Sequence, residues 1–194
     1  EAILRHPEIL FVIRAHPDEG RAGKESRESV AQWVKETATD RLPNVVFVDS
    51  GEFISSYDLI QRSHFVMVYN STIGLEAAIL GKAVLAGGKA RFTQLATSFF
   101  PSSLEEYNHK LEELLSAKAI TVPPEFKINA RRFLYYQLYV TSLPFDAFVE
   151  EDGVWKGYVK LKEFPVESLH PDRSATLKAI LDGIMNNGNF ELQP

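Results

Sequence analysis

The sequence contains no cysteine, and this absence excludes a disulfide framework and metal sites built from thiolates. No apolar run approaches the roughly 20 residues that a membrane-spanning helix needs. Neither a Walker A motif nor a G-x-G-x-x-G fingerprint is present, so two common phosphate-binding loops are excluded. An excess of positive charge is also lacking: the sequence has 21 basic and 26 acidic residues, and the net charge of −5 argues against nucleic acid as a partner.

The composition that remains, 45% apolar and 24% charged, is that of an ordinary globular protein. Over the first 115 residues short apolar runs alternate with amphipathic helical patterns, which predicts an α/β fold with a doubly wound, Rossmann-like parallel sheet. The first apolar run, at residues 9–14, is nearly continuous, which is typical of a strand buried on both faces. The predicted strands cover residues 9–14, 45–48, 65–69 and 83–86, and the predicted helices cover residues 28–39, 55–63, 73–81 and 104–115.

Helical spacing predicts which side chains of these helices face the core. Val30, Trp33 and Val34 share one face, and so do Tyr57 and Ile60 of the next helix. A loop that contains Gly and Lys is expected between the first strand and its helix, at residues 20–27. The helix at 104–115 has a capping-box Glu106 at its start.

The pattern changes near residue 121, and we predict two parts, residues 1–120 and a helical or irregular extension at 121–194. The extension begins with one helix at 124–140 that is rich in aromatic residues, and we expect it to pack on another domain. A turn at 150–153, a hairpin or extended segment at 155–164 and a helix at 174–185 follow. Because the chain starts at Glu1 and a strand pattern follows almost at once, we expect it to be a piece of a longer protein.

The strand at 65–69 stops at Ser71-Thr72, and a helical pattern begins directly afterwards. Unpaired amides and the helix dipole at such a turn favour an anion. Gly74 permits a close approach, and the carboxylate of Glu76, one turn into the helix, can accept hydrogen bonds from a sugar diol. The alternative is that Ser71 and Thr72 only cap the helix and that Glu76 only complements its dipole.

The dipeptide His-Pro occurs three times, at His6, His16 and His170, but only His16-Pro17 directly follows a predicted buried strand. In doubly wound sheets ligands bind at the carboxyl ends of the strands, where His16 could donate to a phosphate. The alternative is a loop histidine that caps local backbone groups. No metal-binding motif accompanies these residues, and we expect neither a metal nor another cofactor.

Taken together, residues 11–19, 45–50, 57–60 and 70–84 resemble the carboxyl-terminal half of GT-B glycosyltransferases. The sequence is most similar to bacterial capsule polysaccharide biosynthesis proteins, the group that includes the capsule Kdo transferases. These proteins share a His-Pro motif and a Ser-Thr motif with bacterial sialyltransferases. The resemblance covers residues 8–115 well and the rest of the chain only vaguely.

The resemblance implies that residues 1–120 are a Rossmann-like domain that binds a nucleotide sugar, with a CMP-activated sugar as the expected donor. His16, Ser71 and Thr72 would contact the phosphate, Glu76 would take the ribose hydroxyls, and the loop at Ser50 would hold the base. The implied donor-binding residues are His16, Pro17, Ser50, Gly51, Glu52, Ser71, Thr72, Gly74 and Glu76.

The resemblance also implies partners that the sequence does not contain. The catalytic residues are expected in an amino-terminal domain that is absent here, and the 121–194 extension would pack toward it or on residues 1–120. The acceptor would be a polysaccharide or a glycolipid. The location would be cytoplasmic, at most peripheral at the inner face of the membrane.

Three other functions remain open at this point. A CDP-glycerol-type glycerophosphotransferase also pairs a His-Pro with a Ser/Thr motif, although the helical Leu-Glu-Ala-Ala context of Glu76 favours the glycosyltransferase. A sugar-nucleotide epimerase has a similar architecture. The chain could also be a non-catalytic interaction domain of a capsule assembly complex.

Overall fold

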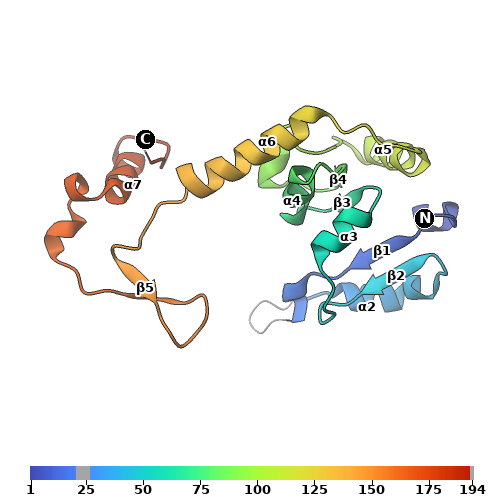
Figure 1. Ribbon diagram of the computed structural model, residues 1–194, viewed down its shortest axis with the longest axis horizontal. Coiled ribbons are helices and arrows are strands. Elements are labelled where there is room, and N and C mark those ends of the chain that lie inside the picture. The colour runs from blue at the N-terminus through green and yellow to red at the C-terminus, as the bar shows by residue number, and fades with distance from the viewer. Residues whose placement is uncertain (21–26, 193–194) are drawn as a thin grey trace. The chain divides into compact units, whose positions relative to one another are not determined.

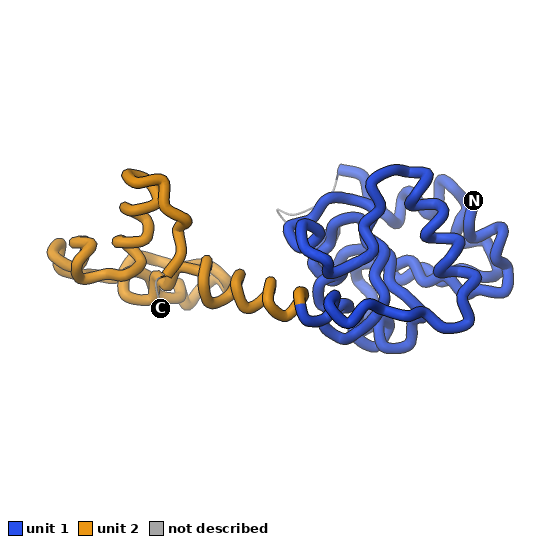
Figure 2. The backbone as a smooth tube through the Cα atoms, turned by 90° about the horizontal axis from the view of Figure 1, so that it is seen from above, with its two compact units in different colours: residues 1–128 blue, residues 129–194 orange. Residues whose placement is uncertain are grey.

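The computed structural model describes residues 1–20 and 27–192, and it divides the chain into two compact units. Unit 1 comprises residues 1–128 and unit 2 comprises residues 129–194 (Figure 2). The division lies inside helix α6 (Pro124–Tyr135), a few residues after the change of character in the sequence. The predicted loop at residues 20–27 lies largely outside the described residues.

Unit 1 is a mixed α/β unit in which short strands and helices alternate along the chain, as the sequence pattern predicts (Figure 1). Its strands are β1 (Phe11–Arg14), β2 (Val45–Val48), β3 (Val66–Val68) and β4 (Val84–Ala86). Its α-helices before α6 are α1 (Ala2–Arg5), α2 (Val30–Glu36), α3 (Ser56–Arg62), α4 (Ile73–Ile79) and α5 (Leu104–Ser116). Its 3-10 helices are η1 (Pro17–Gly20), η2 (Thr39–Arg41) and η3 (Arg91–Gln94).

The four strands form two parallel pairs, β1 with β2 and β3 with β4. The registers place Arg14 beside Val48 and Val68 beside Ala86, so the carboxyl ends of each pair lie at one edge. Among the described residues no backbone ladder joins β1 to β3. The structure therefore shows two parallel pairs rather than one continuous doubly wound sheet, and strands of three or four residues offer few backbone groups for further pairing.

The core of unit 1 is centred on β4, which is buried along its whole length. Leu85 packs against Leu111, Leu114 and Leu115 of α5, while Val84 contacts α4 at Gly74. The other strands are less covered, because the side chains of Val12, Val46 and Met67 are 44%, 44% and 45% exposed. The prediction that the strand at residues 9–14 is buried on both faces is therefore wrong at Val12.

The inward faces of two helices were predicted only in part. In α2 Val34 is buried as expected, but Trp33 is 51% exposed. In α3 Ile60 is buried, whereas Tyr57 is 51% exposed and its hydroxyl donates to a carboxylate on α4. Helix α5 is confirmed, with Ser103 Oγ accepting from the Glu106 amide at 3.1 Å.

Unit 2 contains the end of α6, a π-helical turn at Tyr136–Val140, a two-stranded hairpin and helix α7 (Ala175–Met185). The single helix predicted at 124–140 is thus confirmed, with a wider final turn. The hairpin pairs β5 (Val149–Glu151) with β6 (Val159–Leu161) in antiparallel fashion. The prediction of a turn at 150–153 was wrong at its start, because residues 149–151 pair with a strand ten residues away. Between β6 and α7 lie the 3-10 helices η5 (Val166–Leu169) and η6 (Pro171–Arg173).

Candidate functional site

His16 is exposed directly beyond the end of β1. Its Nδ1 accepts a hydrogen bond from the Asp18 amide at 3.1 Å, so a neutral ring carries its proton on Nε2. Pro17 begins η1, and the carboxylate of Glu19 in this turn accepts from the Val30 amide at 3.0 Å. The loop is therefore tied to α2 while the imidazole presents one N–H that can donate to an anion.

The loop after β2 is held by its own side chains. The Asp49 carboxylate accepts from the Ser50 amide at 2.6 Å and the Ser50 hydroxyl at 3.3 Å, and Glu52 accepts from the Asp49 amide at 2.9 Å. A methyl group at Gly20 would lie 3.4 Å from Ser50 Oγ, so the η1 loop and this loop are adjacent. Gly51 has open space around it.

The Ser71-Thr72 turn places two hydroxyl groups before α4. Ser71 is half-buried and its Oγ accepts only a long bond of 3.5 Å from the Ile73 amide, while Thr72 is exposed and its side chain makes no capping bond. Among the described residues, no acceptor is bonded to the amides of Ser71 and Thr72. These donors are available to a ligand.

Gly74 has a packing role. A Cβ there would lie 2.9 Å from Val68 Cγ2 and 3.2 Å from the Phe92 ring, so only glycine lets α4 pack this closely on β3 and β4. Its amide donates to the Ser71 carbonyl at 3.0 Å. The close approach that Gly74 permits in the structure is that of the helix to the strands, and its part in ligand binding stays a prediction.

Glu76 is half-buried in α4, and its carboxylate accepts a short hydrogen bond from the Tyr57 hydroxyl of α3. This bond to the carboxylate raises the pKa of Tyr57 above its ordinary value of 10.0. The phenol therefore remains a donor at neutral pH and fixes the direction of the carboxylate. Sequence reasoning missed the role of Tyr57, because its partner is 19 residues away.

Arg14 is a second residue that sequence reasoning missed. It is the last residue of β1, and its Nε and Nη1 are buried without a hydrogen-bond partner. The signal was present in the sequence, because an arginine that ends an otherwise apolar strand is costly to bury and calls for a partner.

The nine predicted residues fall into two groups. The β1–β2 register and the Gly20–Ser50 contact bring His16 and Pro17 together with Ser50, Gly51 and Glu52. Ser71, Thr72, Gly74 and Glu76 share the turn and helix after β3. Helix α3, which follows the first group in the chain, connects to the second group through Tyr57 and Glu76. Among the described residues, no hydrogen bond joins His16 directly to Ser71 or Thr72.

Several other features lie away from these groups. A groove of about 730 Å³ beside α5 is lined by residues that include Phe99, His109 and Lys110, and none of the nine predicted residues lines it. In the described part of the chain, no group of three or more His, Asp or Glu side chains could hold a metal ion. None of the helices described has the length and apolar character that a membrane span requires.

One comparison with known proteins shows the family to which the chain belongs. The family model described as "Capsule polysaccharide biosynthesis protein" matches residues 1–117, which is more than half of the sequence and includes all nine predicted residues. No curated protein and no solved structure matches the chain. The match supports a role in capsule synthesis, and the chain belongs to the capsule polysaccharide biosynthesis protein family.

Proposed function

We propose that this chain is the donor-binding part of a glycosyltransferase that builds capsule or related surface polysaccharide, and that its donor is a CMP-activated sugar. The observation that carries the proposal is the placement of His16 and the Ser71-Thr72 turn, both directly beyond strands of parallel pairs. The family match supports the pathway, and the resemblance to GT-B enzymes supports the donor.

Phosphate binding at this site would rest on neutral donors. The Nε2–H of His16, the hydroxyls of Ser71 and Thr72 and their two amides can surround phosphate oxygens, because these amides have no acceptor among the described residues. Such a set offsets phosphate charge by hydrogen bonding, and we propose that no metal is needed.

The nucleoside would lie between α3 and the loop after β2. The Glu76 carboxylate, directed by Tyr57, can accept both hydroxyls of a ribose. The open space at Gly51 and the half-buried Ser50 leave room for a base beside the η1 loop. The two parallel pairs would then act as the two halves of one doubly wound, Rossmann-like sheet.

The rest of the enzyme would be supplied by other parts. We propose that the catalytic base and the site for a polysaccharide or glycolipid acceptor belong to an amino-terminal domain, and that residues 121–194 pack on that domain or on residues 1–120. We also propose that the enzyme works in the cytoplasm, at most peripherally at the membrane. The isolated chain would bind the nucleotide weakly and would transfer no sugar.

Calorimetric titration of the whole 194-residue chain with CMP, CDP, UDP and GDP tests the proposal. CMP and CDP should bind more tightly than UDP and GDP, at concentrations below the millimolar range. Preferential binding of CDP with no affinity for CMP would favour a glycerophosphotransferase. A folded chain that binds none of the four at millimolar concentration would refute the proposal and favour an interaction domain.

A further inference from the structure

Arg14 stands out because its charged side chain is partly enclosed without a counter-charge. Nε and Nη1 of its guanidinium are buried and have no hydrogen-bond partner, and the only other such side-chain atom among the described residues is Ser98 Oγ. By contrast, Arg5 at the start of unit 1 bonds to the Glu112 carboxylate at 2.5 Å. The chain carries 26 acidic residues, yet among the described residues Arg14 forms no ion pair.

This arrangement is unfavourable in the free protein. Buried polar groups are almost always hydrogen-bonded, and a buried donor that is left unpaired costs about 1–3 kcal/mol. A hydrophobic residue would fill the same place at lower cost. An arginine at this position is therefore explained best by a partner that arrives from outside the chain.

The position of Arg14 indicates which partner. The ladder with β2 continues one residue past β1, because the Ala15 amide donates to the Val48 carbonyl at 2.9 Å. Residues two apart along a strand have side chains on the same face, about 6–7 Å apart. Arg14 and His16 would therefore reach the same ligand, beyond the carboxyl end of β1.

The guanidinium group of Arg14 also indicates the chemical class of the ligand. It carries a permanent positive charge that favours a phosphate, and Nη2, which is not among the buried atoms, is the nitrogen from which it can donate to a ligand. We propose that Arg14 is a phosphate-binding residue of the nucleotide site, which donates from Nη2 to the same phosphate that His16 contacts. This inference rests on the proposed function.

The variant Arg14→Met tests the proposal, with Arg62→Met, at an exposed position of α3, as the matched control. Arg14→Met should weaken CMP binding at least about tenfold in calorimetry, because a charge-assisted pair is lost. The affinity for cytidine, which has no phosphate, should not change. Arg14→Lys should fall between wild type and Arg14→Met, and Arg62→Met should match wild type.

Thermal unfolding without ligand separates binding from a structural role. If Arg14 serves to bind a ligand, Arg14→Met should melt at the wild-type temperature or higher, since an unpaired charge is removed. A lower melting temperature with equal losses for CMP and cytidine would assign Arg14 to the fold and overturn the proposal. Unchanged CMP binding would overturn it too, while the proposed function would stand.

If the wild-type chain binds no nucleotide, the proposed function is refuted. The role of Arg14 is then tested by thermal unfolding in the presence of pyrophosphate. Protection of the wild type against thermal unfolding by pyrophosphate, with loss of that protection in Arg14→Met, would support Arg14 as a phosphate ligand. Equal protection of both proteins, or of neither, would overturn it.

Discussion

Two segments of this chain have the same local structure in different surroundings. His16-Pro17-Asp18 lies in unit 1 and His170-Pro171-Asp172 lies in unit 2, and in both the proline begins a 3-10 helix. In both, the histidine Nδ1 accepts from the aspartate amide, at 3.1 Å and 3.4 Å. The sequence His-Pro-Asp therefore has the same turn in both units, whereas His6-Pro7, which is followed by Glu8, ends α1 and begins no 3-10 helix.

The surroundings differ in ways that matter for binding. His16 follows a strand of a parallel pair, beside Arg14 and near the loop of Ser50. His170 lies between two 3-10 helices, and its Nδ1 also lies 3.4 Å from the Asp172 carboxylate. The comparison teaches that the local motif is common to both units, whereas the candidate site depends on the strands beneath His16.

The largest expected effect is a loss of nucleotide affinity that occurs when His16 is replaced and does not occur when His170 is replaced. His16→Ala should weaken CMP binding by about 10- to 100-fold, the value of a hydrogen bond to a charged group. His170→Ala should leave the affinity unchanged in the same calorimetric titration. Equal losses in both variants, or none in His16→Ala, would contradict the distinction between the two segments.

The next effect concerns glycines in the two units. Gly74→Ala places a methyl group 2.9 Å from Val68 in the core. Overpacking costs about 1–3 kcal/mol and better helix propensity offsets up to about 1, so unit 1 should lose about 1 kcal/mol. Gly183→Ala in α7 meets the ring of Phe190, which is 45% exposed and lies outside any helix or strand, so its loss should be smaller.

Urea unfolding measures both changes, and tryptophan fluorescence can report each unit separately. Trp33 lies in unit 1 and Trp155 in unit 2, so a Trp155→Phe background follows Gly74→Ala and a Trp33→Phe background follows Gly183→Ala. If Gly183→Ala proved as costly as Gly74→Ala, the core of unit 1 would not be the more tightly packed of the two.

A smaller effect is expected from two tyrosines that each donate to a glutamate. Tyr57→Phe releases the Glu76 carboxylate and should weaken CMP binding about threefold, a typical value for one hydrogen bond. Tyr136→Phe removes the equivalent bond to Glu191 in unit 2 and should not affect binding. The ratio of the affinities for CMP and for 2′-deoxy-CMP should also fall in Tyr57→Phe and stay the same in Tyr136→Phe. An unchanged ratio in Tyr57→Phe would argue against ribose binding by Glu76.

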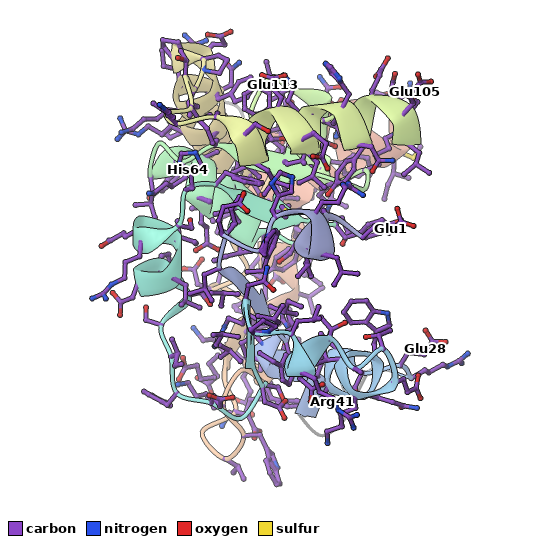
Figure 3. All side chains as sticks on the ribbon, turned by 90° about the vertical axis from the view of Figure 1, so that its right-hand side faces the viewer. Glu1, Glu28, Arg41, His64, Glu105 and Glu113 are labelled. Atoms are coloured by element: carbon purple, nitrogen blue, oxygen red, sulfur yellow. The ribbon has the colours of Figure 1, made fainter. Side chains whose placement is uncertain are left out.

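The smallest effect is a dependence of stability on pH in unit 1. His6 Nε2 lies 2.8 Å from the Glu112 carboxylate, and this bond raises the pKa of His6 above its ordinary 6.5. Hydrogen bonds from Arg5 and His6 lower the pKa of Glu112 below its ordinary 4.5. Figure 3 shows the segment at Glu1 beside α5, the helix that carries Glu105 and Glu113.

The signs of these shifts define the pH range. The His6 contribution is complete below pH 6.5 and disappears as the pH rises through the raised pKa, whereas the Glu112 contribution is complete above pH 4.5 and disappears in acid. Thermal unfolding of wild type should thus lose stability above pH 6.5 relative to His6→Asn. His109→Asn, an exposed position on α5, should follow the wild-type curve. Parallel curves for wild type and His6→Asn would show that the pair does not contribute.

Much of the fold could be predicted because it depends on local pattern. The 3.6-residue spacing and Ser103 define α5 almost to the residue, and apolar runs locate all four strands of unit 1. The start of the hairpin at Val149 was missed, because pairing with Leu161 outweighs the turn-forming residues that follow. The exposure of Trp33 was missed because helical spacing alone does not show how much of a face the strands cover.

The candidate site, like the fold, could be predicted from the sequence only in part. Positions such as His16 and Ser71 could be proposed from the sequence, since each directly follows an apolar run. The bond from Tyr57 to Glu76 and the packing of Gly74 on Val68 depend on how helices pack, which spacing does not encode. The sequence shows an arginine at the end of an apolar run, but only the structure shows that two of its nitrogens are buried without a partner.

The most direct test of the account is an NMR titration of the isotope-labelled chain with CMP. We expect the amide shifts to change at residues 14–20, 49–52 and 70–76, while the amides around His170 stay unchanged. Equal changes around both His-Pro segments, or changes confined to the groove beside α5, would contradict the claim that the strand ends of unit 1 form the nucleotide site.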